Sequence, residues 1–335
     1  MPENSTVYYK GIYWNDYAPT REYINAAISG NGSVDWSNYF GSKVNKSFRK
    51  ALILNCGNGW VERDLHKQGL FQSAIGVDYS RELLDIAISA AESQGLPIEY
   101  FQADTNSGIF PANQYDLVIN HAAAHHITRI DRVFRALANI LSEDDLFVSF
   151  DYVGPHRNQY SVQAWSHLWE LNRSLPEAVK HPTLHYPHYP TMLATDPSEA
   201  VHSELIKTIF NRYFHCIEWC DLGGAIAYPL LTHNTALACA SAQESDFYIR
   251  KILAEDDAFK RDHPDSSLFA FFYGKPNKSV LANLELLQSF TEEEEQRELL
   301  AQQNGGRYYE PNILQYLYEE LEHQRCTQAL SSSTT

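Results

Sequence analysis

Three histidines and a later acid are the residues of this chain best suited to acid–base chemistry. His121, His125 and His126 lie in the stretch HAAAHHI after an apolar run, and Asp151 comes late in a second apolar run. An imidazole with a pKa of ~6.5 suits proton transfer near neutrality. A buried acid is unfavourable unless it has partners, so Asp151 is the strongest catalytic candidate. Of His125 and His126, we expect one to be structural and the other to hydrogen-bond or deprotonate a substrate.

The same histidines also permit a metal interpretation. His121 and His125 are four residues apart and could share one face of a helix. A second histidine-rich stretch, HPTLHYPHYP, has comparable spacing, but its prolines disfavour a regular helix there. No acidic or cysteine third ligand lies near HAAAHHI in the sequence. We therefore predict that the protein holds no metal.

A glycine-rich turn is the second candidate site. The apolar run 51–54 is broken by NCGNG (residues 55–59), and a helix with acidic residues in its first turn follows. A strand, turn and helix of this kind let a ligand approach bare backbone. Asp78 ends the next apolar run, about twenty residues on, where an acid can accept hydrogen bonds from both hydroxyls of a ribose.

Two phosphate-binding motifs are missing from this turn, and their absence narrows the choice of ligand. A dinucleotide fingerprint would need a glycine where Glu62 stands, and a carboxylate there would repel a pyrophosphate. No Gly-Lys-Ser/Thr follows, so the turn is not a phosphate-binding P-loop either. The pattern favours a cofactor with a ribose and no phosphate, and S-adenosylmethionine (SAM) is the common one. The plain alternative is an ordinary tight turn between a strand and a helix.

Five motifs, in order, resemble those of class I SAM-dependent methyltransferases: LNCGNG, GVDYS, FQAD, YDLVINHAAAHHI and LFVSFDYVGP. A narrower resemblance is to a bacterial group of these enzymes. Three segments carry it: YWNDYAP…SVDW, DYVGPHR and DPSEAVHSE…DLGGAIAY. The resemblance covers roughly residues 8 to 275. Ile53 stands where the family has an acid or a small polar residue, and Asn55 replaces the first glycine. Asparagine is the non-glycine residue that best accepts a left-handed backbone.

The resemblance implies SAM as the cofactor and assigns residues to it. It places the ribose on Asp78 and the adenine near Asp104, whose carboxylate would accept from the exocyclic amine. The other predicted cofactor residues lie in the turn, at strand ends and in the N-terminal segment: Asn55, Gly57, Gly59, Tyr79, Thr105, Asn120, His121, Tyr13 and Trp14. The predicted catalytic residues are Asp151, His125, His126 and Arg157.

Apolar runs predict strands near residues 51–54, 74–77, 98–102, 115–120, 146–153, 216–222 and 268–273. The expected fold is α/β, a Rossmann-like seven-stranded class I methyltransferase sheet with helices on both faces and, as the resemblance implies, one antiparallel strand. Five parts are expected: an aromatic N-terminal lid (1–47), a SAM-binding core (48–153), a substrate-cap insertion (154–215), the last strands (216–275) and a helical C-terminal extension (276–335). Asp196 is expected to cap a helix over 197–214.

Composition limits the partners and the compartment. The formal net charge of -16 disfavours nucleic acid and anionic membrane as partners. Five cysteines without CxxC pairs fit a reducing compartment. The N-terminus lacks the pattern of a signal peptide and no apolar run approaches ~18 residues. We therefore expect a cytoplasmic protein. The C-terminal helices are expected to dock on the core as a hairpin, with a partner or homodimer surface as the alternative, and the block EEEE (292–295) to be solvated.

These observations predict SAM-dependent methyl transfer to a small molecule. The acceptor is expected to be a hydroxyl of a sugar or secondary metabolite, aligned with the methyl group by the cap and by Asp151. N- or C-methylation stays open. The alternative is a non-catalytic protein of the same fold that acts as a binding module through its C-terminal helices. A nicotinamide-dependent oxidoreductase is disfavoured by the missing third glycine.

Overall fold

The computed structural model describes residues 11–111 and 114–317. Its centre is a seven-stranded sheet with the order β3-β2-β1-β4-β5-β7-β6. Neighbouring strands from β3 to β5 are parallel, whereas β7 is antiparallel to β5 and β6. The strands are β1 (Phe48–Leu54), β2 (Phe71–Asp78), β3 (Ile98–Gln102), β4 (Leu117–His121), β5 (Leu146–Tyr152), β6 (Phe214–Asp221) and β7 (Phe269–Pro276). The predicted seven-stranded Rossmann-like sheet, with one antiparallel strand, is confirmed.

Two apolar clusters cover the two faces of the sheet, because successive side chains of a strand point to opposite sides. Ala51 and Ile53 of β1 belong to one cluster, and Leu52 and Leu54 to the other. The first face is covered by α2 (Trp36–Val44), α3 (Trp60–Lys67) and α4 (Arg81–Ser93). The second is covered by α5 (Ile130–Ile140), α8 (Ile206–Tyr213), α12 (Lys278–Leu281) and α13 (Leu284–Gln303). Helices therefore lie on both faces, as predicted.

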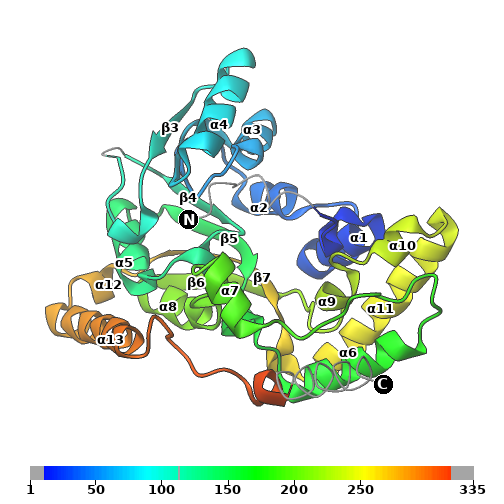
Figure 1. Cartoon of the computed structure of the whole chain (residues 1–335). Coiled ribbons are helices and arrows are strands. Elements are labelled where there is room, and N and C mark those ends of the chain that lie inside the picture. Colours follow the sequence, from blue (N-terminus) through cyan, green and yellow to red (C-terminus); the bar gives the residue numbers. More distant parts are fainter. Residues whose placement is uncertain (1–10, 112–113, 318–335) are drawn as a thin grey trace.

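A further group of helices lies beside the sheet, to the right in Figure 1 and away from α3 and α4. It comprises α1 (Ala18–Ser29), α6 (Val162–Ser174), α9 (Ala227–Leu231), α10 (Thr235–Cys239) and α11 (Ala242–Asp262), with α7 (Tyr189–Thr195) nearer the sheet. The carboxylate of Asp256 in α11 is 1% exposed and accepts backbone hydrogen bonds from Gly224, Ile226 and Ala227. One buried acid thus fixes the loop before α9 against α11.

The segment before α8 differs from the prediction. The helix expected over 197–214 begins only at Ile206, after a short 3₁₀ turn, η6 (Ser203–Leu205). Asp196 is not an N-cap: it follows the end of α7 as its C-cap, and its Oδ1 accepts from the backbone N–H and the hydroxyl of Ser198 in a local turn. The chain over 196–202 is therefore an irregular loop.

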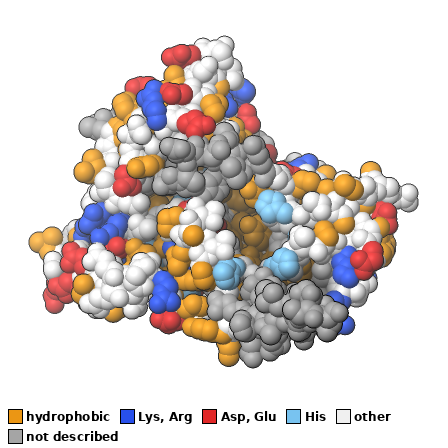
Figure 2. All heavy atoms as spheres, viewed as in Figure 1, with side chains coloured by type: hydrophobic (Ala, Val, Ile, Leu, Met, Phe, Trp, Pro, Cys, Tyr) orange, Lys and Arg blue, Asp and Glu red, His pale blue; other side chains and the backbone are white. Residues whose placement is uncertain are grey.

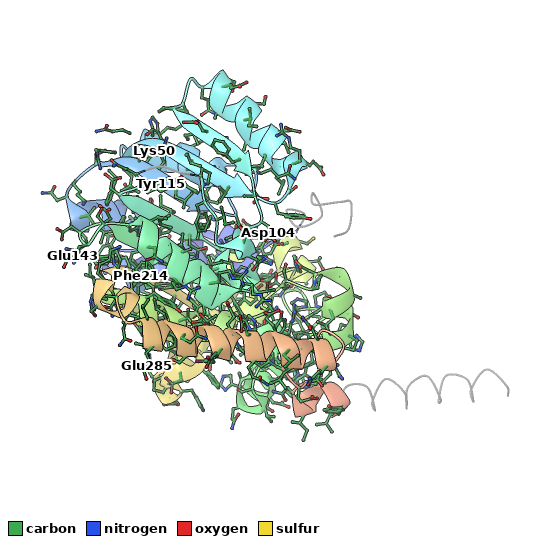
Figure 3. The ribbon with its side chains drawn as sticks, turned by 90° about the vertical axis from the view of Figure 1, so that its left-hand side faces the viewer. Lys50, Asp104, Tyr115, Glu143, Phe214 and Glu285 are labelled. Atoms are coloured by element: carbon green, nitrogen blue, oxygen red, sulfur yellow. The ribbon has the colours of Figure 1, made fainter. Side chains whose placement is uncertain are left out.

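One glutamate of the acidic block on α13 differs from the prediction of solvated glutamates, whereas Glu292, Glu293 and Glu295 are exposed as predicted. Glu294 is 4% exposed and accepts from the backbone N–H of Asp131 at the start of α5. Asp131, itself 2% exposed, pairs with Arg212 at 2.9 Å and with Arg297 at 2.6 Å. A carboxylate at a helix N-terminus is favoured by the helix dipole. α13 is therefore docked on α5 by buried charges, and Figure 3 shows it crossing in front of that face from Glu285.

The chain after α13 runs back to the segment that follows β5. The ring of Tyr309 stacks on His156 with centroids 3.8 Å apart, and its hydroxyl lies 2.8 Å from Nδ1 of His202. The backbone N–H of Tyr189 donates to Gln315 at 2.8 Å. Most of the predicted second helix of the hairpin lies outside the described residues, which end at 317.

Within the described ranges, no helix combines the length and the apolar character needed to cross a bilayer.

Candidate active site

The carboxyl ends of the parallel strands bring the predicted residues to one edge of the sheet. Asn55 follows β1, Asp78 ends β2, His121 ends β4 and Asp151 lies one residue before the end of β5. In Figure 3, Asp104, which follows β3, lies across the sheet from Lys50 and Tyr115, which mark the opposite edge. The strand order reverses between β1 and β4, and in open α/β sheets ligands bind in the crevice at such a point.

The glycine-rich turn has the backbone that its sequence predicts. Asn55, Gly57 and Gly59 have φ values of 43°, 57° and 75°. A Cβ at Gly59 would lie 2.5 Å from the hydroxyl of Tyr100, so a larger residue does not fit there. Asn55 also bridges two loops, because its amide donates to the carbonyl of Ala123 at 3.4 Å and its Oδ1 accepts from the hydroxyl of Thr105.

Asp78 is placed to hold a ribose. Its Oδ2 accepts from the backbone N–H of Gly57 at 2.8 Å, and its Oδ1 accepts from the N–H of Ser80 at 2.7 Å. A carboxylate offers about four acceptor positions, so acceptor capacity is left for two hydroxyl groups. Burial raises the pKa of Asp78 above its ordinary value. The residues present therefore fit the ribose of SAM.

A second acid lies beneath this turn. Glu62, in the first turn of α3, is fully buried, and burial raises its pKa to about 7. Neither of its carboxylate oxygens, nor the hydroxyl of Tyr100, has a hydrogen-bond partner among the described residues. The sequence suggested only that Glu62 excludes a pyrophosphate. The structure adds that this carboxyl group is buried, and that the nearby hydroxyl of Tyr100 offsets only part of the effect of burial on its pKa.

The residues expected around the adenine are spread over the surface. Asp104 is exposed and accepts from the backbone N–H of Asn106, so its carboxylate also caps a local turn. Thr105 is 4% exposed and donates to Asn55, as described above. Tyr79 is 56% exposed, and its carbonyl accepts from Gln102. Of the three, only Asp104 and Tyr79 have side chains open to a ligand.

His121 forms an aromatic wall at the end of β4. Its ring stacks between Trp36 of α2 and Phe150 of β5, with centroids 5.8 Å and 5.5 Å away. Trp60, 48% exposed, meets the same ring edge-on. Burial lowers the pKa of His121 to about 4, so the ring is neutral at neutral pH. A neutral ring in this position can form a wall of the crevice, and the assignment of His121 to the cofactor stays a prediction.

Asp151 is the most fully bonded acid of the site. It has no exposed surface and lies 2.5 Å from Nδ1 of His125. It also accepts from the amide of Asn120 at 2.6 Å and from the backbone N–H groups of Ala123 and Ala124 at 3.1 Å and 2.6 Å. A carboxylate with these partners cannot reach a substrate. The side chain of Asp151 therefore contacts His125 and not open space, which disfavours the prediction that Asp151 itself aligns the acceptor.

The two adjacent histidines have different electrostatic states. Burial opposes protonation of His125, but the charge of Asp151 and the hydrogen bond to it raise the pKa of His125 to about 9. Burial lowers the pKa of His126, and the positive charge of His125, whose ring centroid lies 4.2 Å away, lowers it further. His125 and Asp151 are therefore a tightly coupled buried pair, in which the carboxylate favours protonation of the imidazole against the effect of burial.

Glu199 meets both histidines from the loop before α8. Its Oε2 lies 3.9 Å from Nε2 of His125 and 3.6 Å from Nε2 of His126. Nδ1 of His126 lies 3.1 Å from the hydroxyl of Ser198. These contacts bring residues 125 and 199 together at the carboxyl edge of the sheet.

Arg157 is structural, which corrects its prediction as a catalytic residue. It is 2% exposed and has a φ of 52°. Its guanidinium donates to the carbonyls of Glu199 at 2.8 Å and Pro197 at 2.6 Å. Arg157 therefore holds the loop that carries Glu199. It does not pair with Asp151, whose carboxylate contacts His125.

Of the two aromatic residues predicted from the N-terminal segment, Trp14 differs from expectation, whereas Tyr13 stays a prediction. Trp14 is 2% exposed and stacks on Phe269 at 4.9 Å, so it packs in the core and cannot bind a ligand. Tyr13 packs edge-on against His233 at 5.2 Å. Burial and the charge of Glu199 raise the pKa of Tyr13, which therefore lies on the Glu199 side of the site.

A cavity of about 330 Å³ opens close to this cluster. Tyr160, Trp165, His181 and Tyr228 are among its lining residues. The charge of Glu199 raises the pKa of both Tyr160 and Tyr228, after burial, which places the cavity beside the histidine cluster. Figure 2 shows a hollow in this face, with hydrophobic side chains at its base and histidines around it.

Comparison with known proteins agrees with this geometry. Residues 51–144 match the family model of a methyltransferase domain. Over this segment the chain is similar to methyltransferase domains. The predictions of a SAM-dependent methyltransferase and of SAM as its cofactor are confirmed at the level of this domain. The narrower bacterial group stays a prediction.

The alignments with similar proteins cover only part of this chain and only part of each relative. The uncharacterized methyltransferase YcgJ of Bacillus subtilis is 30% identical over 104 residues, 31% of this chain and 41% of that protein. The arginine-hydroxylase NDUFAF5 of Rattus norvegicus is 23% identical over 111 residues, 33% of this chain and 31% of that protein. The chain thus spans less than half the length of either relative.

One similar solved structure is phosphoethanolamine N-methyltransferase 2 of Haemonchus contortus in complex with S-adenosyl-L-methionine. Its TM-score is 0.44 at 16% identity, covering 77% of this chain and 57% of that one.

The sequence missed two residues of the site. Glu199 belongs to the DPSEAV motif, but nothing in its spacing connects it with histidines more than seventy positions earlier. Trp36 was one of many aromatic residues in the first 47, and only the fold distinguishes it as the ring against His121.

Proposed function

We propose that the chain is a SAM-dependent methyltransferase that acts on a hydroxyl group of a small molecule, with sugars and secondary metabolites as the acceptor classes. The observation that carries the proposal is the cluster of His125, His126 and Glu199 beside the crevice between β1 and β4. Groups that hold and deprotonate an acceptor are needed at that place.

The cofactor half of the site is formed by the methyltransferase domain. The turn of residues 55–59 would admit SAM to its backbone, Asp78 would accept from the ribose hydroxyls, and Asp104 lies where the adenine would extend. SAM supplies an electrophilic methyl group on a sulfonium. The aromatic wall around His121 would exclude water from the reacting atoms.

The acceptor half is formed by the cluster and the cavity beside it. His126 and Glu199 would hold the acceptor hydroxyl and draw off its proton, while Asp151 fixes the ring of His125 through Nδ1. Residues 154–215, which carry Glu199 and part of the cavity lining, would act as a cap that chooses the acceptor. Positioning supplies much of the rate in a displacement of this kind.

The test uses labelled methyl transfer. The full chain is incubated with methyl-labelled SAM and a panel of sugars, phenols and amines, and labelled product is measured. We expect His126→Asn to lower turnover by about 10²-fold, the usual scale for a positioned acid or base, with SAM affinity within a few-fold of wild type. His215→Asn is the matched control, because His215 is exposed on β6 at the opposite edge of the sheet.

Two outcomes contradict the proposal. Full turnover in His126→Asn would remove the histidine cluster from the reaction. SAM binding without transfer to any acceptor class would favour the non-catalytic alternative, for which the bridge from Asn55 to Thr105 across the cofactor turn is the supporting observation.

A further inference from the structure

We propose that His125, His126 and Glu199 bind a divalent transition-metal ion of the zinc type. One ligand atom from each of the three residues lies within 4.8 Å of the others. This set differs from the sequence-based metal interpretation, which considered His121 with His125 and was rejected for lack of an acidic third ligand. The fold supplies that ligand from residue 199.

The separations fit shared coordination better than direct hydrogen bonding. Oε2 of Glu199 lies 3.6 Å from Nε2 of His126 and 3.9 Å from Nε2 of His125, both beyond ordinary hydrogen-bond length. In a tetrahedral site with metal–ligand bonds of about 2.0–2.1 Å, neighbouring ligand atoms are about 3.3 Å apart. Side-chain movements of a few tenths of an ångström would bring Glu199 to that spacing from each histidine, and all three ligand atoms already lie within 4.8 Å of one another.

The other ring nitrogen of each histidine is already engaged. Nδ1 of His125 lies 2.5 Å from Asp151, and Nδ1 of His126 lies 3.1 Å from the hydroxyl of Ser198. Metal-binding histidines almost always hold their second nitrogen in this way, and a carboxylate at that position orients the ring and strengthens the ligand. The Asp151–His125–Glu199 arrangement therefore has the form of a carboxylate–histidine–metal site.

The local charge also favours a cation. Three carboxylates surround the two imidazoles: Asp151, Glu199, and Asp196 at 3.9 Å from Nδ1 of His126. The guanidinium of Arg157 donates to backbone carbonyls of this loop. Imidazole and one carboxylate suit zinc and cobalt, whereas magnesium prefers oxygen ligands alone.

The role of such an ion rests on the function proposed above. Three protein ligands leave at least one coordination position open, and an acceptor hydroxyl bound there would have a lowered pKa. With the ion bound, His126 and Glu199 act on the hydroxyl as ligands of the ion and not as its base, and the O–H bond breaks with release of the proton to water. The oxygen then forms a bond to the methyl carbon as the sulfur–methyl bond breaks, and the cofactor leaves as the neutral thioether. Two histidines and a glutamate are thus a means of presenting an alkoxide at neutral pH.

The test is a titration of the metal-stripped full chain with Co²⁺, followed by visible absorption. We expect one Co²⁺ per chain with tetrahedral-type bands, displaced by Zn²⁺ and not by Mg²⁺. Glu199→Gln and His126→Gln should each weaken Co²⁺ binding by at least tenfold. His215→Gln, the exposed histidine on β6, should leave it unchanged. Circular dichroism and the SAM-induced rise in melting temperature verify that each variant is folded.

The proposal is overturned if millimolar Co²⁺ gives no bands, if both ligand variants keep the wild-type affinity, or if His215→Gln weakens binding as much as they do. Its failure is distinguishable from failure of the proposed function, because the Co²⁺ bands need neither SAM nor an acceptor. Binding of Co²⁺ without binding of SAM would overturn the methyltransferase proposal alone. Full methyl transfer by chelator-treated protein would overturn the catalytic role of the ion.

Discussion

Glu62 makes the stability of this protein fall as pH rises, and the fall can be calculated. The carboxyl is fully buried under the cofactor turn, and burial raises its pKa from 4.5 to about 7. Between these two values the unfolded chain releases the proton while the folded chain keeps it. The folded state then binds more protons, so the free energy of unfolding decreases with rising pH. At ~1.4 kcal/mol for each pH unit, the full effect is about 3 kcal/mol.

Glu62→Gln removes this titration while keeping the shape of the side chain. We expect wild type to lose about 2–3 kcal/mol of unfolding free energy between pH 5 and pH 8 relative to the variant. Urea unfolding of both proteins at the two pH values measures these free energies. Subtracting the change in the variant from the change in wild type cancels the contribution of every other titrating group. Glu82→Gln is the control, because Glu82 is exposed in the first turn of α4. Parallel pH profiles for wild type and Glu62→Gln would refute the reasoning.

Two further predictions concern the cofactor and the C-terminal helix. A hundredfold excess of SAM over its dissociation constant should add about 2.7 kcal/mol to wild-type stability, and Asp78→Asn should lose most of the resulting shift in melting temperature. An equal shift in that variant would remove Asp78 from the ribose site. Asp131→Ala should lower the unfolding free energy by about 3 kcal/mol, because it leaves the half-buried Arg212 and Arg297 without their shared partner. A loss well below that in urea unfolding would mean that α13 is held mainly by its apolar contacts.

The parts of the fold that sequence could predict are those with local rules. A strand is indicated by a short run of apolar and β-forming residues between turn residues, and such runs identified all seven strands. The left-handed turn at residues 55–59 could be predicted from the backbone freedom of glycine. The position of Asp78 could be predicted from the spacing within one strand–helix–strand unit. These features depend on neighbours close in the chain.

The errors arose where the outcome depends on distant contacts. Trp14 has the residue type of a lid, but aromatic type does not distinguish a ring packed on Phe269 from one that meets a ligand. Arg157 follows a candidate catalytic acid by six positions, yet its left-handed backbone turns its guanidinium toward the 196–199 carbonyls. This contact between Arg157 and the loop positions Glu199. No pattern in the sequence indicates such a contact.

The position of β7 has a consequence for how the chain reaches this fold. β7 (Phe269–Pro276) is made after β6 yet lies between β5 and β6, and it is the only strand with which β6 pairs. During synthesis, β5, whose side chains are buried along its whole length, therefore waits with an open hydrogen-bonding edge for more than a hundred residues. An open, apolar edge is a site for mispairing with other chains. The emerging polypeptide is thus most prone to aggregate between the synthesis of residue 152 and that of residue 276, and closure of the sheet by insertion of β7 should be a late, slow step of folding.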